Sequence, residues 1–197
     1  MNDLLMVKKT QIEMVRDRNY IINDDELLIL NDRKVKNITY NQSYQKMGDD
    51  EQTLYVQYCL NMTPIDIMKT FVKQMKTHTV GIIIGSDDDL NTLHKKTYQE
   101  YFDQLKLKSV QLFNYDELYF NITQHVFSPI YERIDKDLII PTIAHANQLP
   151  VLLKNDPIVK YYHFPAGSVI KVTEELFMDS YISVQIRYCI VTNQIKV

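Results

Sequence analysis

The sequence is poor in the residues that build linkers, disulfide frameworks and membrane spans. Its 197 residues include only 4 Gly, 6 Pro and 2 Cys, and no Trp. So few glycines and prolines leave little room for long linkers, and the two cysteines are most simply buried thiols of a reducing compartment. No apolar run approaches the roughly 18 residues that span a bilayer, and no signal peptide is recognisable at the start. These absences predict an intracellular soluble protein without a membrane partner.

Positive charge is not in excess either. The 22 Lys and Arg residues are outnumbered by 25 Asp and Glu, which gives a net charge of -3. Residues 125–197 hold seven of each sign, so the acidic surplus lies in residues 1–124. A dedicated nucleic-acid binder is normally basic, so the balance argues against that class.

Catalytic and metal-binding signatures are missing as well. The five histidines are scattered without ligand spacing, and no nucleophile turn is present. The run Asp87–Asp89 follows a predicted buried strand, where it would either hold a divalent metal or form the acidic first turn of a helix; the helix is the commoner reason. A nuclease of this fold class would need carboxylates on the strand 54–59, which has none. We predict no catalytic residue, no metal, no cofactor and no small-molecule ligand.

The first 120 or so residues alternate between helical and strand patterns. Leu5, Ile12 and Val15 share one face of a helix over 3–18, while the basic side chains Lys8, Lys9, Arg16 and Arg18 lie largely elsewhere. Alternation of strand and helix predicts parallel strands and an α/β domain. The further expected elements are short helices at 24–30 and after Thr63-Pro64, a helix at 89–106, strands at 36–40 (weak), 54–60, 80–84 and 109–113, and a loop at 41–52.

Two of these helices carry a distinct apolar face. After Thr63-Pro64, an N-cap followed by a proline at the first helical position, the expected inward residues are Ile65, Met68, Val72 and Met75, with Phe71 beside them. In the helix 89–106 they are Leu90, Leu93, Tyr98, Tyr101, Phe102 and Leu105. Both faces are expected to cover the sheet.

The C-terminal third predicts a small α+β module. Asp156-Pro157 should begin a short helix, and the Pro165–Gly167 turn should end it before a strand at 168–172. The last strand alternates clearly: Ile182, Val184, Ile186, Tyr188 and Ile190 point one way and Ser183, Gln185 and Arg187 the other. We expect the apolar side to be the buried one.

The ordered series Gln148–Pro150, Asp156–Tyr162, Gly167–Lys171 and Tyr181–Ser183 resembles the assembly domain of one RNA polymerase subunit. That subunit is the fifth-largest one, shared by the eukaryotic nuclear enzymes, and the archaeal enzyme has a smaller counterpart of it. Residues 8–26 and 118–125 also resemble this family. The resemblance implies an α/β jaw-like domain at 1–122, with a small mixed sheet flanked by helices, and an α+β assembly domain at 123–197.

The same resemblance implies a non-catalytic polymerase subunit. Its C-terminal domain would dock on the largest subunit, near neighbouring subunits, and its N-terminal domain would form part of the jaw for entering DNA. Matching positions make the interface candidates Gln148, Leu149, Pro150, Asp156, Pro157, Tyr161, Gly167 and Tyr181. Each of these could instead shape the domain, and for Pro157 and Gly167 backbone geometry favours that alternative.

Double-stranded DNA is expected to be bound only weakly and within the complex. Asp87–Asp89 would repel phosphate, so Lys95 and Lys96 are the DNA-proximal candidates. A free-standing transcription regulator or interaction module that shares the fold is the alternative function.

Three departures from the family pattern stand out. Asn19 occupies a helix end where glycine is usual, and asparagine is the next-best residue for a left-handed conformation. The segment from Pro129 to Gln148 is short and interrupted by Pro141. High Asn, Ile, Lys and Tyr content suggests an A+T-rich genome, which points to a large cytoplasmic DNA virus. The location would then be the viral factory in the host cytoplasm and the virion; for a cellular version it would be the nucleus.

Overall fold

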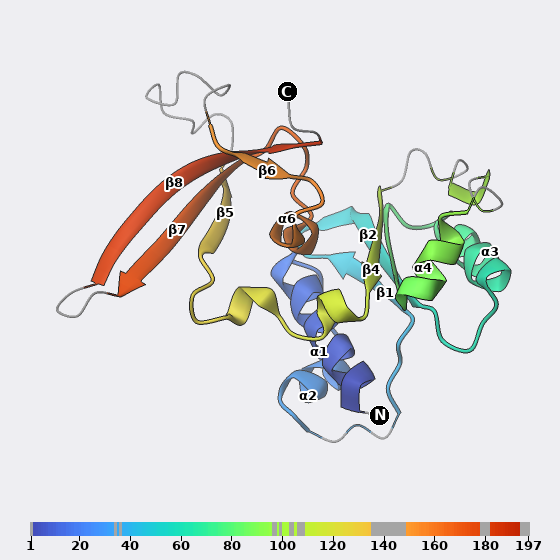
Figure 1. Cartoon of the computed structure of the whole chain (residues 1–197). Helices are drawn as coiled ribbons and strands as arrows, with labels where there is room; N and C mark the ends of the chain where they lie inside the picture. Colours follow the sequence, from blue (N-terminus) through green and yellow to red (C-terminus); the bar gives the residue numbers. More distant parts are fainter. Residues whose placement is uncertain are drawn as a thin grey trace. The chain divides into compact units, whose positions relative to one another are not determined.

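The computed structural model describes residues 2–33, 35, 37–95, 98, 100–102, 105, 109–134, 149–177 and 182–193. The chain forms two compact units, Met1–Phe120 (unit 1) and Asn121–Val197 (unit 2). Each unit has a four-stranded sheet of its own (Figure 1). The roles of jaw and assembly domain stay predictions, so the two units are described here by their structure alone.

Unit 1 is built on a sheet with strand order β1-β2-β3-β4. Strands β2, β3 and β4 are parallel, and β1 joins β2 in antiparallel fashion. The predicted α/β architecture is therefore confirmed, since parallel neighbours require the crossover helices that the alternation of patterns indicated. Its elements are α1 (Asn2–Asp17), α2 (Asp24–Leu30), β1 (Gln42–Lys46), β2 (Asp49–Tyr58), α3 (Pro64–Gln74), β3 (Val80–Gly85), α4 (Asp87–Leu93), β4 (Ser109–Asn114) and the 3-10 turn η1 (Asp116–Leu118).

Helices cover this sheet on both faces (Figure 1). On one face, Ile67 and Phe71 of α3 and Leu93 of α4 pack against Tyr55 and Ile83. On the other face, Tyr58 of β2 turns its hydroxyl towards Gln11 of α1. Strand β3 is buried along its whole length, as its unbroken apolar run predicted.

Local capping chemistry sets the helix starts. Thr63 caps α3 ahead of Pro64. Ser86 and Asp89 form a reciprocal capping box on α4, in which the Ser86 side chain accepts from the Asp89 N–H and the Asp89 carboxylate accepts from the Ser86 N–H. The acidic run is therefore a helix N-terminus, which satisfies otherwise unpaired amide donors.

Asn19 ends α1 in the left-handed conformation that the sequence predicted, with φ of 63°. The chain then turns onto the edge of the sheet. The Ile21 N–H donates to the Gln45 carbonyl at 2.9 Å, and the Met47 N–H donates to the Asn19 carbonyl at 2.8 Å. Tyr20 bridges Lys46 between these two bonds. The short segment after α1 thus pairs with β1.

The polar stretch 41–52 is not a loop but a hairpin, because β1 and most of β2 lie in it. Its side chains are largely exposed, so the strand pattern carries no apolar face. Conversely, residues 37–40 form no strand. The predicted helix 89–106 is also wrong as one element, since α4 ends at Leu93 and residues 94–95 are not helical.

The predicted face of α3 is rotated. Ile65 is exposed, and Ile67 is buried in its place beside Met68 and Phe71. The Ile67 carbonyl also accepts a bond from the Gln57 side chain at 3.1 Å. This buried bond helps to fix the orientation that the sequence did not reveal.

The largest correction in unit 1 concerns Lys8, which the sequence placed away from the core. Its side chain is 0% exposed and forms an ion pair with Glu26, 2% exposed, at 3.2 Å. Lys8 also donates to the Gln11 side chain at 2.9 Å. The Tyr44 hydroxyl donates to the same Glu26 oxygen at 2.5 Å. We call Lys8, Gln11, Glu26 and Tyr44 the buried polar cluster.

Unit 2 has a second sheet, in which α6 packs on one side. The strand order is β5-β7-β8-β6, antiparallel except for the β6–β8 pair. This confirms the predicted α+β module. Its elements are the 3-10 turn η2 (Ile122–Gln124), β5 (Ile130–Ile134), β6 (Val151–Leu153), α6 (Pro157–Tyr162), β7 (Val169–Phe177) and β8 (Ile182–Thr192). Across the described part of the chain, no helix combines the length and apolarity that a bilayer crossing requires.

Candidate partner interface

The inner face of the unit 2 sheet forms the core of that unit. Ile170 and Val172 of β7 lie beside Cys189 and Val191 of β8, and Val159 of α6 packs on them. Burial raises the pKa of the Cys189 thiol, an effect that the neighbouring Arg187 partly offsets. This core fixes the surface on which the sequence-predicted residues lie.

The start of α6 follows from Asp156 and Pro157. The Asp156 carboxylate accepts from the Ile158 N–H at 2.9 Å, and Pro157 occupies the first helical position. Both residues therefore have a local role, because a proline there sacrifices no helical hydrogen bond. Pro157 is exposed and Asp156 half-buried.

Pro150 and Gly167 serve the backbone around β6 and β8. The Pro150 carbonyl accepts from the Ile190 N–H at 2.9 Å. Gly167 has φ of 85°, where side chains are rarely tolerated, and its N–H donates to the Val191 carbonyl at 2.8 Å. Both residues are exposed, and Leu149 beside Pro150 is half-buried.

Tyr161 lies inside the unit rather than on it. Only 2% of the residue is exposed, and its hydroxyl accepts a hydrogen bond from the Asn121 side chain at 2.9 Å. Its ring meets Tyr162 edge-on, with the centroids 5.0 Å apart. Tyr161 thus ties α6 to the residue that opens unit 2, and it offers little surface to another molecule.

Four of the predicted site residues can be placed on one side of unit 2, and others cannot be compared. Gln148, Tyr181 and the DNA-proximal candidate Lys96 lie outside the described residues. Lys95 belongs to unit 1, where it is exposed immediately beyond α4. In unit 2, Leu149, Pro150, Asp156 and Pro157 gather around β6 and the start of α6.

The sequence missed the surface that stands out most in unit 2. All the exposed large apolar residues described in this unit fall in two places: four on one face of the sheet, and two immediately before β5. Their exposed fractions run from 48% to 80%. We call this set the outer apolar face: Val126, Phe127, Ile130, Val151, Val184 and Ile186.

Strand register puts the four sheet residues on a single face. Ile130 pairs with Thr173, and Thr173 pairs with Ile186, which makes one row across three strands. Glu175 pairs with Val184 in the next row. Since alternate residues of a strand share a face, these side chains all point away from α6 and the core.

The apolar alternation of β8 is real, but the prediction that this side is buried is wrong. Val184 is 58% exposed and Ile186 51% exposed, whereas Cys189 and Val191 of the opposite side are buried. Helix α6 covers only the inner face. Alternation in a sequence shows that two sides differ, and it does not show which side the rest of the chain covers.

A shallow groove borders the outer apolar face. Its cavity volume is about 250 Å³, and it runs between the segment 126–130 and β7. Phe127 and Ile130 line one wall, and Glu174 and Glu175 line the other. Glu174 is bound to Arg187 at 2.6 Å, so Glu175 is the exposed acid at the rim.

The charged groups on this face are otherwise paired. Lys171 of β7 donates to Glu132 of β5 at 2.8 Å, and this bond raises the pKa of the lysine. Among the described residues, no cluster of three His, Cys, Asp or Glu has the arrangement of a metal site. Apolar contact with a macromolecule is what this geometry suits best.

These features define a two-unit α/β and α+β protein with an unusually apolar outer sheet face on its C-terminal unit. Residues 120–183 match the family model described as RNA polymerase Rpb5, C-terminal domain. The similarity extends well beyond that domain. A Dictyostelium discoideum protein, DNA-directed RNA polymerases I, II, and III subunit rpabc1, is 27% identical over 179 residues, which cover 87% of this chain and 89% of the relative.

Two Arabidopsis thaliana relatives agree. Subunit 5B of DNA-directed RNA polymerases IV and V is 23% identical over 85% of this chain and 81% of its own length. Subunit 5C of DNA-directed RNA polymerase V is 25% identical over 85% of this chain and 76% of its own length. The chain is an Rpb5-like subunit of a DNA-directed RNA polymerase.

Proposed function

We propose that the chain is a non-catalytic subunit that anchors itself to the largest polymerase subunit through unit 2 and contributes unit 1 to the jaw around entering DNA. The observation that carries the anchoring role is the outer apolar face. Burying a large apolar side chain stabilises an assembly by about 1.5–3 kcal/mol when it goes from full exposure to full burial. Six half-exposed or more exposed side chains therefore provide a substantial driving force.

The size of unit 2 supports the same proposal. It has roughly 75 residues, near the lower limit at which a single core is comfortably stable. Its core occupies only the inner side of the sheet. A partner that covers the outer side would complete a second layer, which is the arrangement that most sheets need.

Within unit 2, the sequence-predicted residues then divide by role. Asp156, Pro157, Tyr161 and Gly167 shape the unit, whereas Leu149 and Pro150 lie next to Val151 and extend the docking surface. Gln148 and Tyr181 remain proposed contacts on the strength of the family pattern alone. For the jaw, exposed Lys95 is the described candidate for contact with DNA.

Recovery of the tagged full chain from cells that express it naturally, followed by a high-salt wash, tests the proposal. We expect the largest polymerase subunit to be recovered at equal stoichiometry, because apolar contacts resist salt whereas exposed ion pairs are screened. The informative variant is Ile186→Asp, which places a charge in the centre of the outer apolar face. Its matched control is Gln185→Asp, which changes the adjacent exposed residue on the opposite side of β8.

Ile186→Asp should abolish recovery of the largest subunit while Gln185→Asp retains it. Circular dichroism of both purified variants should show an intact fold, since neither side chain is buried. Recovery of the wild-type chain alone would contradict the subunit role and favour a free-standing regulator. Equal recovery with both variants would leave the subunit role standing but would remove the outer apolar face as its anchor.

A further inference from the structure

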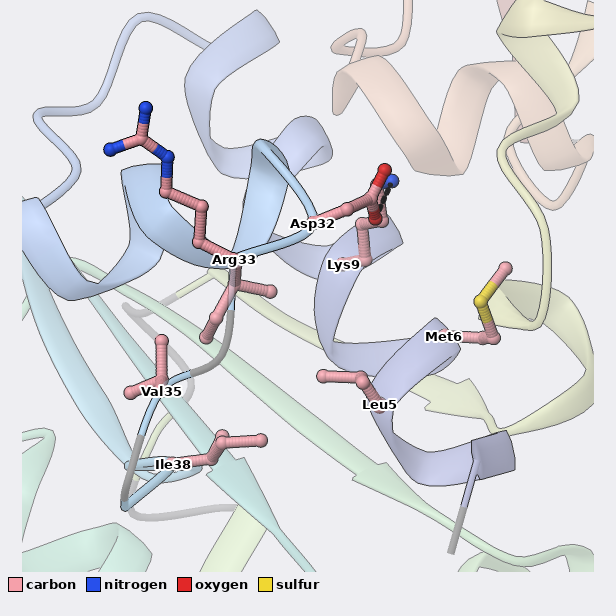
Figure 2. A pocket seen from close by; sticks show the side chains of 8 residues that line it. Leu5, Met6, Lys9, Asp32, Arg33, Val35 and Ile38 are labelled. Carbon is pink, nitrogen blue, oxygen red and sulfur yellow. Dashed lines mark hydrogen bonds and ion pairs between the residues drawn. The ribbon is translucent and has the colours of Figure 1, made fainter.

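A second apolar concavity lies in unit 1, away from every predicted contact residue. Its cavity volume is about 340 Å³, and it is formed by α1, the end of α2 and the segment that follows α2. Figure 2 shows Leu5 of α1 directed across it towards Val35 and Ile38. Ile29 of α2, only 6% exposed, lies at its base. We call this concavity the α1–α2 groove.

Helix α1 leaves apolar surface uncovered at this groove. Leu5 is 38% exposed and Met6 42% exposed, although Ile12 and Val15 farther along the helix are fully buried. The sequence grouped Leu5 with those core residues. A cavity of this size, walled by apolar side chains, accommodates two or three apolar side chains of a ligand.

The rim of the groove carries a net positive charge. The Lys9 ammonium and the Asp32 carboxylate meet at 2.8 Å and neutralise each other. Arg33, the third charged residue at the rim, is exposed. Its backbone N–H donates to the Leu28 carbonyl, but its guanidinium forms no hydrogen bond or ion pair with another described residue. The guanidinium extends away from the apolar side chains (Figure 2), where a carboxylate can reach it from solvent.

We propose that the α1–α2 groove docks an amphipathic helix from a partner protein, with two or three apolar side chains on Leu5, Met6 and Ile29 and an acidic residue paired with Arg33. Such helices present apolar residues at i, i+3 or i+4 and i+7, and they lie in grooves of this kind. A guanidinium binds a carboxylate in a fork of two parallel bonds, which selects an acidic partner over a basic one. This contact is independent of the anchoring role of unit 2.

A display library of 16-residue amphipathic helices, randomised at both apolar and charged positions, tests this proposal on the purified full chain. We expect selected peptides to converge on apolar residues with helical spacing and on Asp or Glu beside them. Met6→Asp should remove their binding. Leu27→Asp should retain it, because Leu27 has a matching exposure of 43% but lies outside the groove.

The charge requirement is tested by Arg33→Glu, with Lys76→Glu as the exposed-cation control. Arg33→Glu should weaken binding about tenfold or more, corresponding to loss and reversal of one ion pair. Enrichment of basic peptides, binding that survives Met6→Asp, or a library that yields no binder would each overturn the proposal. Self-association of the chain that Met6→Asp abolishes would overturn it too, since a second copy would then occupy the groove.

Discussion

Replacing Lys8 by methionine would test whether the buried polar cluster holds the first two helices to the sheet. Methionine keeps the length of the side chain but removes its charge and its three donors. The Glu26 carboxylate would then remain in a site where it is 2% exposed, with the Tyr44 hydroxyl at 2.5 Å. Removing one partner of a buried ion pair typically costs about 3–5 kcal/mol, because the other charge stays desolvated.

The structure supplies a matched control one residue away. Lys9 also forms an ion pair, with Asp32 at 2.8 Å, but that pair is 27% and 81% exposed. Exposed pairs contribute about 0–1 kcal/mol. Lys9→Met should therefore cost at most about 1 kcal/mol, so the difference between two neighbouring lysines measures the effect of burial.

A second substitution separates the charge from the packing. Glu26→Gln removes the negative charge, and glutamine can still fill the N3 position of the α2 capping box, where Asn23 and Glu26 bond reciprocally. Combined with Lys8→Met, it should recover at least about 1.5 kcal/mol relative to the sum of the single changes, because neither charge is then left alone.

Urea unfolding of the full chain, followed by hydrogen exchange of peptides from β2 and β3, reads the stability of unit 1 separately from that of unit 2. A cost below about 1 kcal/mol for Lys8→Met would refute the reasoning. So would strict additivity in the double variant, since it would mean that Lys8 and Glu26 do not stabilise each other.

Three further results are expected. Asn19→Gly should raise the free energy of unfolding by about 0.5 kcal/mol and Asn19→Val should lower it by about 1–2 kcal/mol, as chemical denaturation would show, because φ is 63° there; equal effects would contradict this. Burial, with a smaller contribution from Asp89, raises the pKa of the Cys59 thiol from 9.0 to about 12. Because the folded state keeps this proton longer than the unfolded state, the contribution of Cys59 is complete below pH 9 and is lost as pH rises towards 12. Cys59→Ala should flatten the urea midpoint between pH 9 and pH 11, and an unchanged slope would exclude Cys59 as its cause. In reconstituted polymerase, Lys95→Glu should weaken binding of downstream DNA about twofold to threefold at low salt and reduce the salt dependence, whereas Lys76→Glu should not; identical DNA affinities would remove Lys95 from the jaw contact.

Much of unit 1 could be predicted because its signals are local. Thr63-Pro64 and Ser86 mark helix starts through bonds that span only three residues. The apolar run of β3 needs no partner to be recognised as buried. Asn19 likewise announces a left-handed helix end by its residue type.

The missed features depend on distant partners. Lys8 is buried only because Glu26 and Tyr44, 18 and 36 residues away, supply an acceptor and a hydroxyl. A periodicity analysis assigns a lysine to the solvent, since unpaired buried ammonium groups are costly. The β1–β2 hairpin was hidden for the related reason that its outer strand has little apolar surface to bury.

The outer apolar face illustrates a different limit. The period of β8 was evident, but the choice of the buried side depended on where α6 packs. Interface residues were sought among family motifs, and several of those serve caps and turns instead. The signal that would have found the face is a strand whose two sides both carry apolar residues, Cys189 and Val191 on one and Val184 and Ile186 on the other.

The turn at Asn19 has a consequence for how the isolated chain behaves at high concentration. An open sheet margin is a template on which a second molecule can add a strand, and repeated addition leads to fibres and precipitates. The segment Asn19–Ile21 takes up amide and carbonyl groups along β1 that would otherwise face outward. One residue with φ of 63° therefore lets α1 double as a guard for that margin. Shortened chains that lack α1 would expose it and aggregate even where their sheet still forms.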